Sequence, residues 1–317
     1  SFSYTVAAED TTTGAASVSA SAGGFTDAVT TATVVLPMIQ LSAVATTQVA
    51  FAIDDAFTAQ VGVPLANGSA LSAAQARRAG GAPLVATITS SNGSAAALVT
   101  SAQLNDTVTV AIAPGSATSP ATVATGGVAV RALSPGSSTI RVTHPYITST
   151  TTSSQVTVTV TQPTVALNTP ANIGAGLQIS ASGSLTSGQH GGISVVVRSA
   201  NPAVLRVARL ATDIATDSII IPLANGITSF TYFIAGVEGA TGAVAIDATA
   251  PNYTAAQTTG TVVTPRLDVS GLVVSRVAGG ADDPFIVRVG IPNAGNTAIA
   301  TLQNVRAGSS GLTVTLT

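Results

Sequence analysis

Short runs in which apolar and polar residues alternate recur along most of the chain. The clearest are Val108–Ile112, which reads Val-Thr-Val-Ala-Ile, and Val156–Val160, which reads Val-Thr-Val-Thr-Val. A period of two places successive side chains on opposite faces of a strand, so that one face is buried and the other meets solvent. The pattern therefore predicts an all-β fold made of tandem β-sandwich domains.

Further strands are expected where β-branched residues cluster between turns rich in Gly, Pro and Asn. The exception is Ala70–Arg78, whose Ala, Leu, Gln and Arg residues predict one or two helical turns that Gly80-Gly81 would stop. In residues 1–162 the expected strands are Ser17–Ala20, Thr31–Leu36, Ile39–Val44, Thr47–Ile53, Phe57–Pro64, Leu84–Thr89, Val128–Ala132 and Thr139–Thr143. In residues 163–264 they are Val165–Asn168, Leu177–Ala181, Ile193–Arg198, Leu205–Ala208, Ser218–Pro222, Ser229–Ala235, Ala243–Ala248 and Gly260–Thr264.

The chain contains one long internal repeat. Residues 1–89 align with residues 229–317 without a gap, at a constant offset of 228, and 35 of the 89 positions are identical. A fixed period of this kind indicates a tandem array of structural units. Among the identical pairs are Phe2 and Phe230, Tyr4 and Tyr232, Pro37 and Pro265, Asp54 and Asp282, Asp55 and Asp283, Phe57 and Phe285, Gly62 and Gly290, Pro64 and Pro292, and Arg78 and Arg306.

The 228-residue period divides into two kinds of domain. We expect residues 37–162 to form a longer domain with an insertion, and residues 163–264 to form a shorter one. Residues 1–36 then match the C-terminal part of the shorter kind, and residues 265–317 match the N-terminal part of the longer kind. These partial domains lead us to expect a window on a longer array. The alternative is that residues 1–36 add strands to an open sheet of a neighbouring molecule.

Composition excludes several classes of protein. Hydrophobic residues make up 46% of the chain and charged residues 8%, which is unlike a charge-rich disordered segment. The net charge is −2 and all 11 basic residues are Arg, so no basic stripe is available for nucleic acid. The chain has no Cys for disulfides and no apolar run of the roughly 18 residues that span a bilayer.

Two phrases of the second domain resemble a known family. They are Ser199–Val207, which reads Ser-Ala-Asn-Pro-Ala-Val-Leu-Arg-Val, and Ala243–Tyr253, which leads into a final Thr/Val strand. Both resemble bacterial immunoglobulin-like repeats of the invasin/intimin type. The likeness is looser in the first domain, where Asn92-Gly93-Ser94 lacks the proline. The resemblance implies immunoglobulin-like sandwiches of the kind found in stalks, adhesin arms and fibres on bacterial surfaces; it specifies a fold and no activity.

Aspartate pairs are the first candidate ligands. Asp54/Asp55 return as Asp282/Asp283, and Asp213 and Asp217 bracket another loop. Calcium needs six to eight oxygen ligands, and carboxylates supply them well. The chain nevertheless has no Asp-rich loop with alternating ligands. We therefore favour the simpler interpretation, in which each pair lies in a turn and accepts a hydrogen bond from the local backbone.

Other catalytic and ligand-binding signals are weak. His144 and His190 are the only histidines, lie in dissimilar loops and do not recur with the repeat, so we interpret both as solvated loop residues. The chain has no Gly-x-Ser-x-Gly motif, and it has no Lys for a phosphate-binding loop. No catalytic, cofactor-binding or metal-ligating residue is assigned, and we expect no small-molecule ligand.

Three aromatic residues occupy one hairpin position in three domains: Phe25, Tyr146 and Tyr253. In a chain with only 3% aromatic residues, we expect these rings to seal the end of each sandwich, with the tyrosine hydroxyls at the rim. The alternative is a contact between neighbouring domains or fibre strands.

Two further sets of residues are weaker candidates. Arg78 and Arg306 hold the same place in the repeat and are candidates for an ion pair between domains. Four Asn-x-Ser/Thr sequons arise easily by chance in so Ser/Thr-rich a chain and predict glycosylation only weakly; they begin at Asn67, Asn92, Asn105 and Asn252.

The sequence thus favours a non-enzymatic structural protein. We expect a segment of a long extracellular or cell-surface repeat array that forms a filament, sheath or fibre. Its low charge would permit self-association of chains, which are expected to have no nucleic-acid partner and no membrane span. The alternative is the stalk of a bacterial adhesin whose binding tip lies outside this chain.

Overall fold

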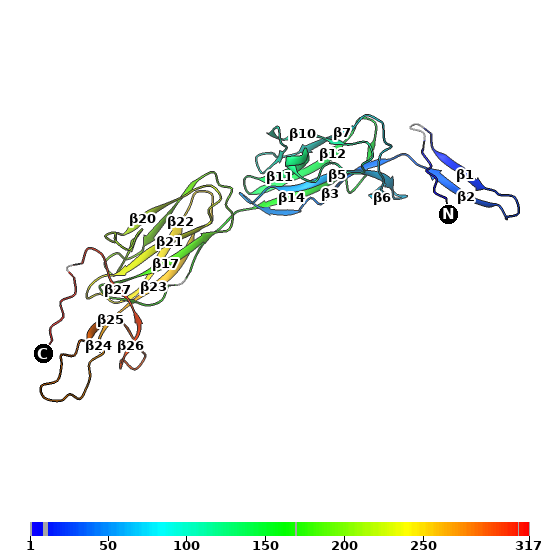
Figure 1. The fold of residues 1–317 in the computed structure, drawn as a ribbon. Coiled ribbons are helices and arrows are strands. Elements are labelled where there is room, and N and C mark those ends of the chain that lie inside the picture. The colour runs from blue at the N-terminus through cyan, green and yellow to red at the C-terminus, as the bar shows by residue number, and fades with distance from the viewer. Residues whose placement is uncertain (1, 9–11, 169, 310, 317) are drawn as a thin grey trace. The chain divides into compact units, whose positions relative to one another are not determined.

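The computed structural model describes residues 2–8, 12–168, 170–309 and 311–316 of the chain (Figure 1). The outermost residues of the repeat, Ser1 and Thr317, therefore lie outside the described residues. The chain separates into two compact units, Ser1–Thr161 and Gln162–Thr317. Within the described residues every regular element is a strand, except for one 3-10 turn at Val123–Thr125, so the predicted all-β class is confirmed.

The first unit contains a sandwich of two sheets. One sheet has the strand order β10-β7-β12-β14-β4, and the other has the order β13-β3-β5-β11-β8-β9, with β6 paired to β5. The strands are β3 (Met38–Ser42), β4 (Thr47–Val49), β5 (Asp55–Pro64), β6 (Leu71–Ala74), β7 (Leu84–Ser90), β8 (Ala96–Val99), β9 (Leu104–Asn105), β10 (Thr107–Ile112), β11 (Val128–Ala132), β12 (Gly136–Thr143), β13 (Thr148–Ser149) and β14 (Gln155–Thr161).

The second unit contains a sandwich with the same topology. Its sheets have the orders β15-β17-β21-β19 and β16-β23-β22-β18-β20, which correspond strand for strand to β3-β5-β11-β8 and β4-β14-β12-β7-β10. The strands are β15 (Val165–Leu167), β16 (Ile173–Gly174), β17 (Leu177–Leu185), β18 (Ile193–Ser199), β19 (Leu205–Ala208), β20 (Ser218–Leu223), β21 (Ser229–Gly236), β22 (Gly242–Thr249) and β23 (Ala256–Val263).

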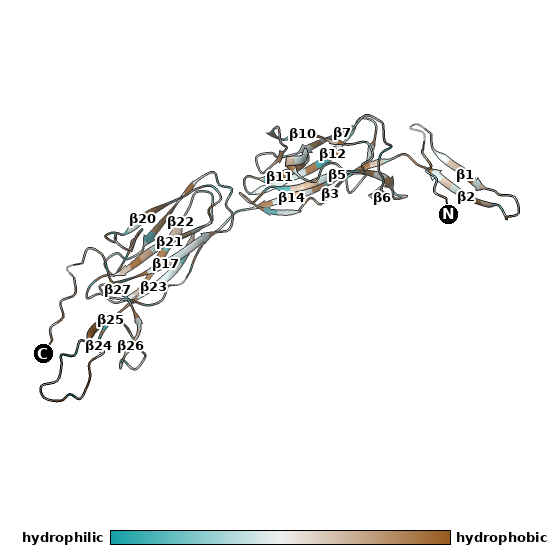
Figure 2. Cartoon of the chain, viewed as in Figure 1, coloured by the Kyte–Doolittle hydropathy of each residue, from teal (hydrophilic) through white to brown (hydrophobic). Residues whose placement is uncertain are grey.

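Alternation along the strands builds both cores. On β10 the side chains of Val108, Val110 and Ile112 are buried while the residues between them are exposed. On β22 the buried side chains are Val244 and Ile246, followed by Ala248. Hydrophobic residues accordingly lie along the strands of the two sandwiches (Figure 2). Each fully buried Val, Leu or Ile side chain contributes about 1.5–3 kcal/mol to folding.

The N-terminal hairpin repeats the last hairpin of the second sandwich. It consists of β1 (Gly14–Ala20) and β2 (Ala28–Val34), and it forms a two-stranded sheet of its own among the described residues. Its pairing register, from Gly14↔Val34 to Ala20↔Ala28, is that of β22 and β23 moved by 228 residues. β1 is exposed along its whole length, whereas β22 is half covered by its sandwich.

The C-terminal sheet repeats the start of the first sandwich. It consists of β24 (Arg266–Ser270), β25 (Ile286–Pro292) and β26 (Ile299–Leu302), which correspond to β3, β5 and β6. Arg266 pairs with Gly290 as Met38 pairs with Gly62. Even the register shift before Pro64 returns before Pro292. The sequence repeat is therefore also a repeat of backbone pairing.

The predicted helical turns at Ala70–Arg78 are wrong. Leu71–Ala74 forms strand β6 against β5, and the Leu71 N–H donates to Gln40 Oε1 over 2.8 Å. The helix preference of Ala and Leu amounts to tenths of a kcal/mol per residue, which a sheet edge readily overrides. The described part of the chain contains no helix of the length and hydrophobicity needed to cross a bilayer.

Candidate functional site at the edge of the second sandwich

The most elaborate polar cluster of the second unit lies where the C-terminal segment meets β17. After β26 the chain leaves its own sheet, and β27 (Asn304–Val305) pairs with β17. The pairing is antiparallel, with Asn304 opposite Gln178. The Arg306 N–H then donates to the carbonyl of Gly176 over 3.0 Å. The segment is thereby added as an edge strand to the second sandwich.

The Gln303 side chain fastens this edge to the strand before β17. Its Nε2 donates to the Asn172 carbonyl over 2.7 Å, and its Oε1 accepts the Gly174 N–H over 2.8 Å. The side chain of Gln303 is buried, with 7% of the residue exposed. A buried carboxamide that meets both a donor and an acceptor fits its site in one orientation, so Gln303 acts as a two-point clip.

Gln178 makes a second clip from the opposite side. Its Nε2 donates to the Ala211 carbonyl over 2.7 Å, and its Oε1 accepts the Ala307 N–H over 3.2 Å. Gln178 is also buried. Gln303 therefore fixes one end of the added strand to β16, and Gln178 fixes the other end to β17.

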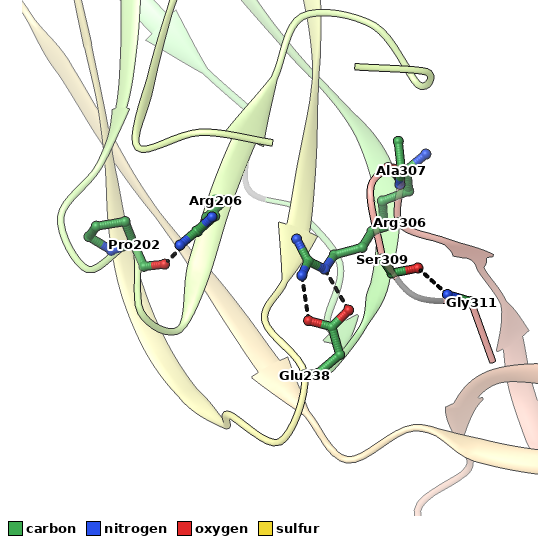
Figure 3. Close-up of polar contacts among 8 residues, drawn as sticks. Pro202, Arg206, Glu238, Arg306, Ala307, Ser309 and Gly311 are labelled. Carbon is green, nitrogen blue, oxygen red and sulfur yellow. Dashed lines mark hydrogen bonds and ion pairs between the residues drawn. The ribbon is translucent and has the colours of Figure 1, made fainter. Parts of the chain in front are cut away.

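An ion pair closes the cluster on its solvent side. Arg306 Nε donates to Glu238 Oε1 over 2.8 Å, and Arg306 NH2 donates to Glu238 Oε2 over 2.5 Å (Figure 3). The Arg306 side chain is 14% exposed and that of Glu238 is 49% exposed. The hydrogen bonds from Arg306 lower the pKa of Glu238 against the opposing effect of burial. The charge of Arg206, whose Nε donates to the Pro202 carbonyl, acts in the same direction.

Two glycines allow the backbone to turn tightly between β16 and β17. A Cβ at Gly174 would lie 2.5 Å from the Leu177 Cδ1 and 3.0 Å from the Pro265 Cβ. Gly176 has a φ of 77°, in the left-handed region that favours glycine. This turn therefore presents the Gly174 N–H and the Gly176 carbonyl to the added strand.

The cluster is suited to holding two segments of the chain together, not to catalysing group transfer. The Gln303, Gln178 and Arg306 side chains are used in hydrogen bonds to backbone or to Glu238. Proton transfer or nucleophilic attack needs an activated group that faces a substrate. Here the polar atoms face one another and connect two segments of the chain, and we name this cluster the joint.

The paired aspartates have partners of two kinds. Asp54 accepts two hydrogen bonds from Arg131, over 2.8 Å at Nε and 2.7 Å at NH2. Asp55 Oδ2 accepts the Ala45 N–H over 3.0 Å. The equivalent Asp283 Oδ2 accepts the Val273 N–H over 2.7 Å and also lies 3.4 Å from Arg276 NH1. These carboxylates act as turn acceptors and ion-pair partners.

The other titratable candidates do not converge. The His144 Nδ1 accepts the N–H of Tyr146, whereas His190 contacts Ile227 and Gly192 in the other unit. Burial, followed by the charge of Arg77, lowers the pKa of His144. The described residues contain no group of three or more His, Cys, Asp and Glu side chains that could hold a metal ion.

The three hairpin aromatics differ from one another. Tyr253 is buried, and its hydroxyl donates to the Ser187 carbonyl over 2.8 Å. Phe25 is 79% exposed and Tyr146 is 93% exposed. The expected sealing of the sandwich is therefore seen for Tyr253, whereas it is wrong for Phe25 and Tyr146 in this structure. Their role in contacts between molecules stays a prediction.

Sequence reasoning singled out Arg306 but missed Gln303 and Glu238. A signal for both was present in the repeat. Gln303 is one of the identical positions, since it returns from Gln75, and Glu238 corresponds to the acidic Asp10. Asp10 itself lies outside the described residues. No family model matches the chain, and a search of curated proteins found no match.

Proposed function

We propose that this chain is a non-catalytic structural protein, a segment of a long extracellular repeat array that forms a filament, sheath or surface fibre. The observation that carries the proposal is the repetition of backbone pairing at an offset of 228 residues. Both β1–β2 and the sheet β24–β25–β26 keep the register of their counterparts. An array of units joined in one order supplies length, which is what a fibre requires.

The joint supports the same function. A strand from the segment after the second sandwich is hydrogen-bonded to that sandwich, and two buried glutamines fix it. Backbone pairing combined with buried side chains restricts the motion of the connection more than a flexible linker would. We infer that the joint sets the angle between a shorter domain and the longer domain that follows it.

The character of the surface supports assembly. The outward residues of β14 are Gln155, Thr157, Thr159 and Thr161. The chain carries a net charge of only −2 over 317 residues. Low charge weakens the repulsion that keeps molecules apart, and threonine-lined strand faces can pack side by side. We propose that neighbouring chains associate through such faces.

The strand order is consistent with an immunoglobulin-like interpretation of both sandwiches. In each, the first strand has a short second part that changes sheets and pairs with the last strand, as β4 pairs with β14 and β16 pairs with β23. Together with the invasin/intimin-like phrases at Ser199–Val207 and Ala243–Tyr253, this favours a bacterial surface location.

Electron microscopy of the purified full chain over a range of concentrations tests the proposal. We expect filaments or laterally ordered bundles that grow with concentration, and sedimentation should show the matching loss of monomer. Dispersed monomers at every concentration would contradict assembly. A hydrolytic or transferase activity that maps to the described residues would contradict a purely structural role.

A further inference from the structure

The edge strands β10 and β20 are equivalent strands of the two sandwiches. Each is the outermost strand of its sheet, and among the described residues no strand pairs with its outer edge (Figure 1). The register of β10 begins where the Ser90 N–H donates to the Asp106 carbonyl over 2.7 Å. The register of β20 begins in the same way, where the Ser199 N–H donates to the Asp217 carbonyl over 2.9 Å. The residues that follow Asp106 are therefore equivalent, one by one, to those that follow Asp217.

The outer edge of β10 is open to an added strand. In an antiparallel pair, successive residues direct their N–H and C=O groups alternately toward the partner strand and away from it. Asp106 faces β7, so the backbone groups of Thr107, Thr109 and Ala111 face away from β7. Edge strands are usually protected by proline, by charged side chains or by a bulge. The strand Thr107–Ile112 has no proline, no charged side chain and no shift in its register.

The outer edge of β20 is closed at the equivalent place. By the same alternation, the backbone groups of Ser218, Ile220 and Pro222 face away from β18. Pro222 has no N–H, and it stands where β10 has Ala111. A strand added to β20 would lack one hydrogen bond there, which is the usual reason for proline on an edge strand. The two sandwiches therefore differ at this edge, and the first is the one that can accept a strand.

β10 is complementary to a second copy of itself in an antiparallel register. Val108, Val110 and Ile112 are buried on the inner face of β10, whereas the residues between them are exposed. With a two-fold axis at Val110, Val110 lies opposite Val110 of the second copy, and Val108 lies opposite Ile112. Thr109 then exchanges backbone hydrogen bonds with Ala111 of the second copy. A shift by one residue would place these valines on the solvent face, so alternation restricts the register.

Charge favours this antiparallel orientation over a parallel one. Asp106 immediately precedes β10 and is exposed. Parallel pairing would place the Asp106 carboxylates of two copies side by side. In the antiparallel register each Asp106 lies opposite Pro114 of the second copy, and the two carboxylates are roughly 27 Å apart at 3.4 Å per residue. This separation exceeds the Debye length of about 8 Å, so the repulsion is screened.

We propose that β10 is the edge through which copies of this chain associate side by side, and that its occupant is β10 of a second copy in this antiparallel register. The sheet β10-β7-β12-β14-β4 then continues from one copy into the other. The inference rests on the proposed array function and names a lateral contact between arrays. The contact recurs with every longer domain, so that pairings that are weak alone act together along an array.

Ala111→Pro in the full chain copies the closed edge of β20 onto β10. Pro222 already occupies the equivalent position of a paired strand, so the fold admits the substitution. We expect the association constant in sedimentation equilibrium to fall at least about tenfold, because each copy loses one hydrogen bond to the other. Thr109→Lys, which puts a charge on the edge, should weaken association as well and covers the case in which proline disturbs folding. Thr249→Lys, the same change at an exposed residue of the inner strand β22, should leave the constant unchanged.

Hydrogen exchange separates edge pairing from other association. The amides of Thr109 and Ala111 should exchange more slowly as the concentration of the parent chain rises, whereas the Ile220 amide on β20 should stay fast. Exchange at Thr109 and Ala111 that is equally fast at every concentration would overturn the proposal. Association of the Ala111→Pro and Thr109→Lys variants at the parent level would overturn it too.

The same samples, viewed by electron microscopy, keep this proposal apart from the array function. Filaments in which the Thr109 and Ala111 amides stay fast would remove the β10 contact and leave the array function standing. Edge-paired dimers that never grow into filaments would support the β10 contact and contradict the array function.

Discussion

Tyr4 and Tyr232 occupy the same position of the repeat, yet Tyr4 is 90% exposed and Tyr232 is fully buried. Phe2 and Phe230 differ in the same way, at 89% and 4%. The side chains are of one kind and the flanking hairpins share one register, so the difference comes from packing partners. Tyr232 and Phe230 lie on β21 between β17 and β19. The equivalent residues near the N-terminus have no such neighbours among the described residues.

Truncating the two phenylalanines should therefore have unequal effects. Phe230→Ala removes a buried ring that lies against Gly183, and we expect it to lower the free energy of unfolding of the second sandwich by about 3–5 kcal/mol. Phe2→Ala should change it by less than about 0.5 kcal/mol. Denaturant unfolding of the full chain, followed by tyrosine fluorescence, measures both. Equal losses would show that Phe2 is buried in solution.

The hydroxyl of Tyr232 offers a second test. It is buried and makes no hydrogen bond with the described residues, whereas the Tyr253 hydroxyl bonds to Ser187. Tyr232→Phe should leave stability unchanged or raise it slightly, because an unpaired buried hydroxyl costs free energy. Tyr253→Phe should lower it by about 1 kcal/mol. A loss at Tyr232 as large as that at Tyr253 would mean that Tyr232 finds a partner.

The same tyrosine should make the stability of the folded chain depend on pH in the alkaline range. Burial raises the pKa of Tyr232 to about 12, above its ordinary value of about 10. The unfolded chain therefore releases this proton first, and stability should fall as the pH rises from 10 to 12, by roughly 2–3 kcal/mol in total. Tyr232→Phe should remove that part of the slope. Ultraviolet titration of the folded chain should show one tyrosine that ionises last.

The joint should weaken in acid. The pKa of Glu238 is lowered, so its ion pair with Arg306 stabilises the joint above the ordinary glutamate pKa of about 4.3 and is lost as the pH falls through the lowered value. Because Glu238 is half exposed, the effect should not exceed about 1 kcal/mol. Hydrogen exchange at the Arg306 amide reports it. In the Glu238→Gln variant at neutral pH, the Arg306 amide should exchange as fast as it does in the parent chain in acid.

The two repeat glutamines give a matched pair of variants. Gln303→Ala leaves the Gly174 N–H and the Asn172 carbonyl without their partner. It should lower the free energy needed to open the joint by about 1–3 kcal/mol. Gln75→Ala, at the exposed equivalent position, should leave the stability of the first sandwich nearly unchanged. Hydrogen exchange at the amides of residues 174–178 should become faster in Gln303→Ala and stay unchanged in Gln75→Ala. Faster exchange in both variants would show that Gln75 also stabilises this edge.

Calcium provides a further check on the aspartates. The Asp54 carboxylate accepts hydrogen bonds from Arg131, and the Asp55 carboxylate accepts one from the Ala45 N–H. Adding calcium or a chelator should therefore leave the melting temperature unchanged. A shift with calcium that Asp54→Asn abolishes would restore the metal interpretation.

The alternation of apolar and polar residues was sufficient to predict most strands, because the buried side chains of a half-buried strand stand at every second position of the sequence. Val128–Ala132 and Leu205–Ala208 were predicted with the bounds that they have. β8 was missed because Ala96–Val99 is buried on both faces and does not alternate. The joint was missed for a different reason: Gln303 is a polar residue whose partners lie about 130 positions earlier in the chain, and spacing alone does not reveal them.

The pairing of the first and last strands of each sandwich has a mechanical consequence. β4 runs parallel to β14, and β16 runs parallel to β23. A pull on the two ends of either sandwich would slide these partners past each other, so their hydrogen bonds would carry the load together instead of opening one after another. Each sandwich is in this respect built to resist tension applied along the chain, and Thr264-Pro265 would pass that tension from β23 directly to β24.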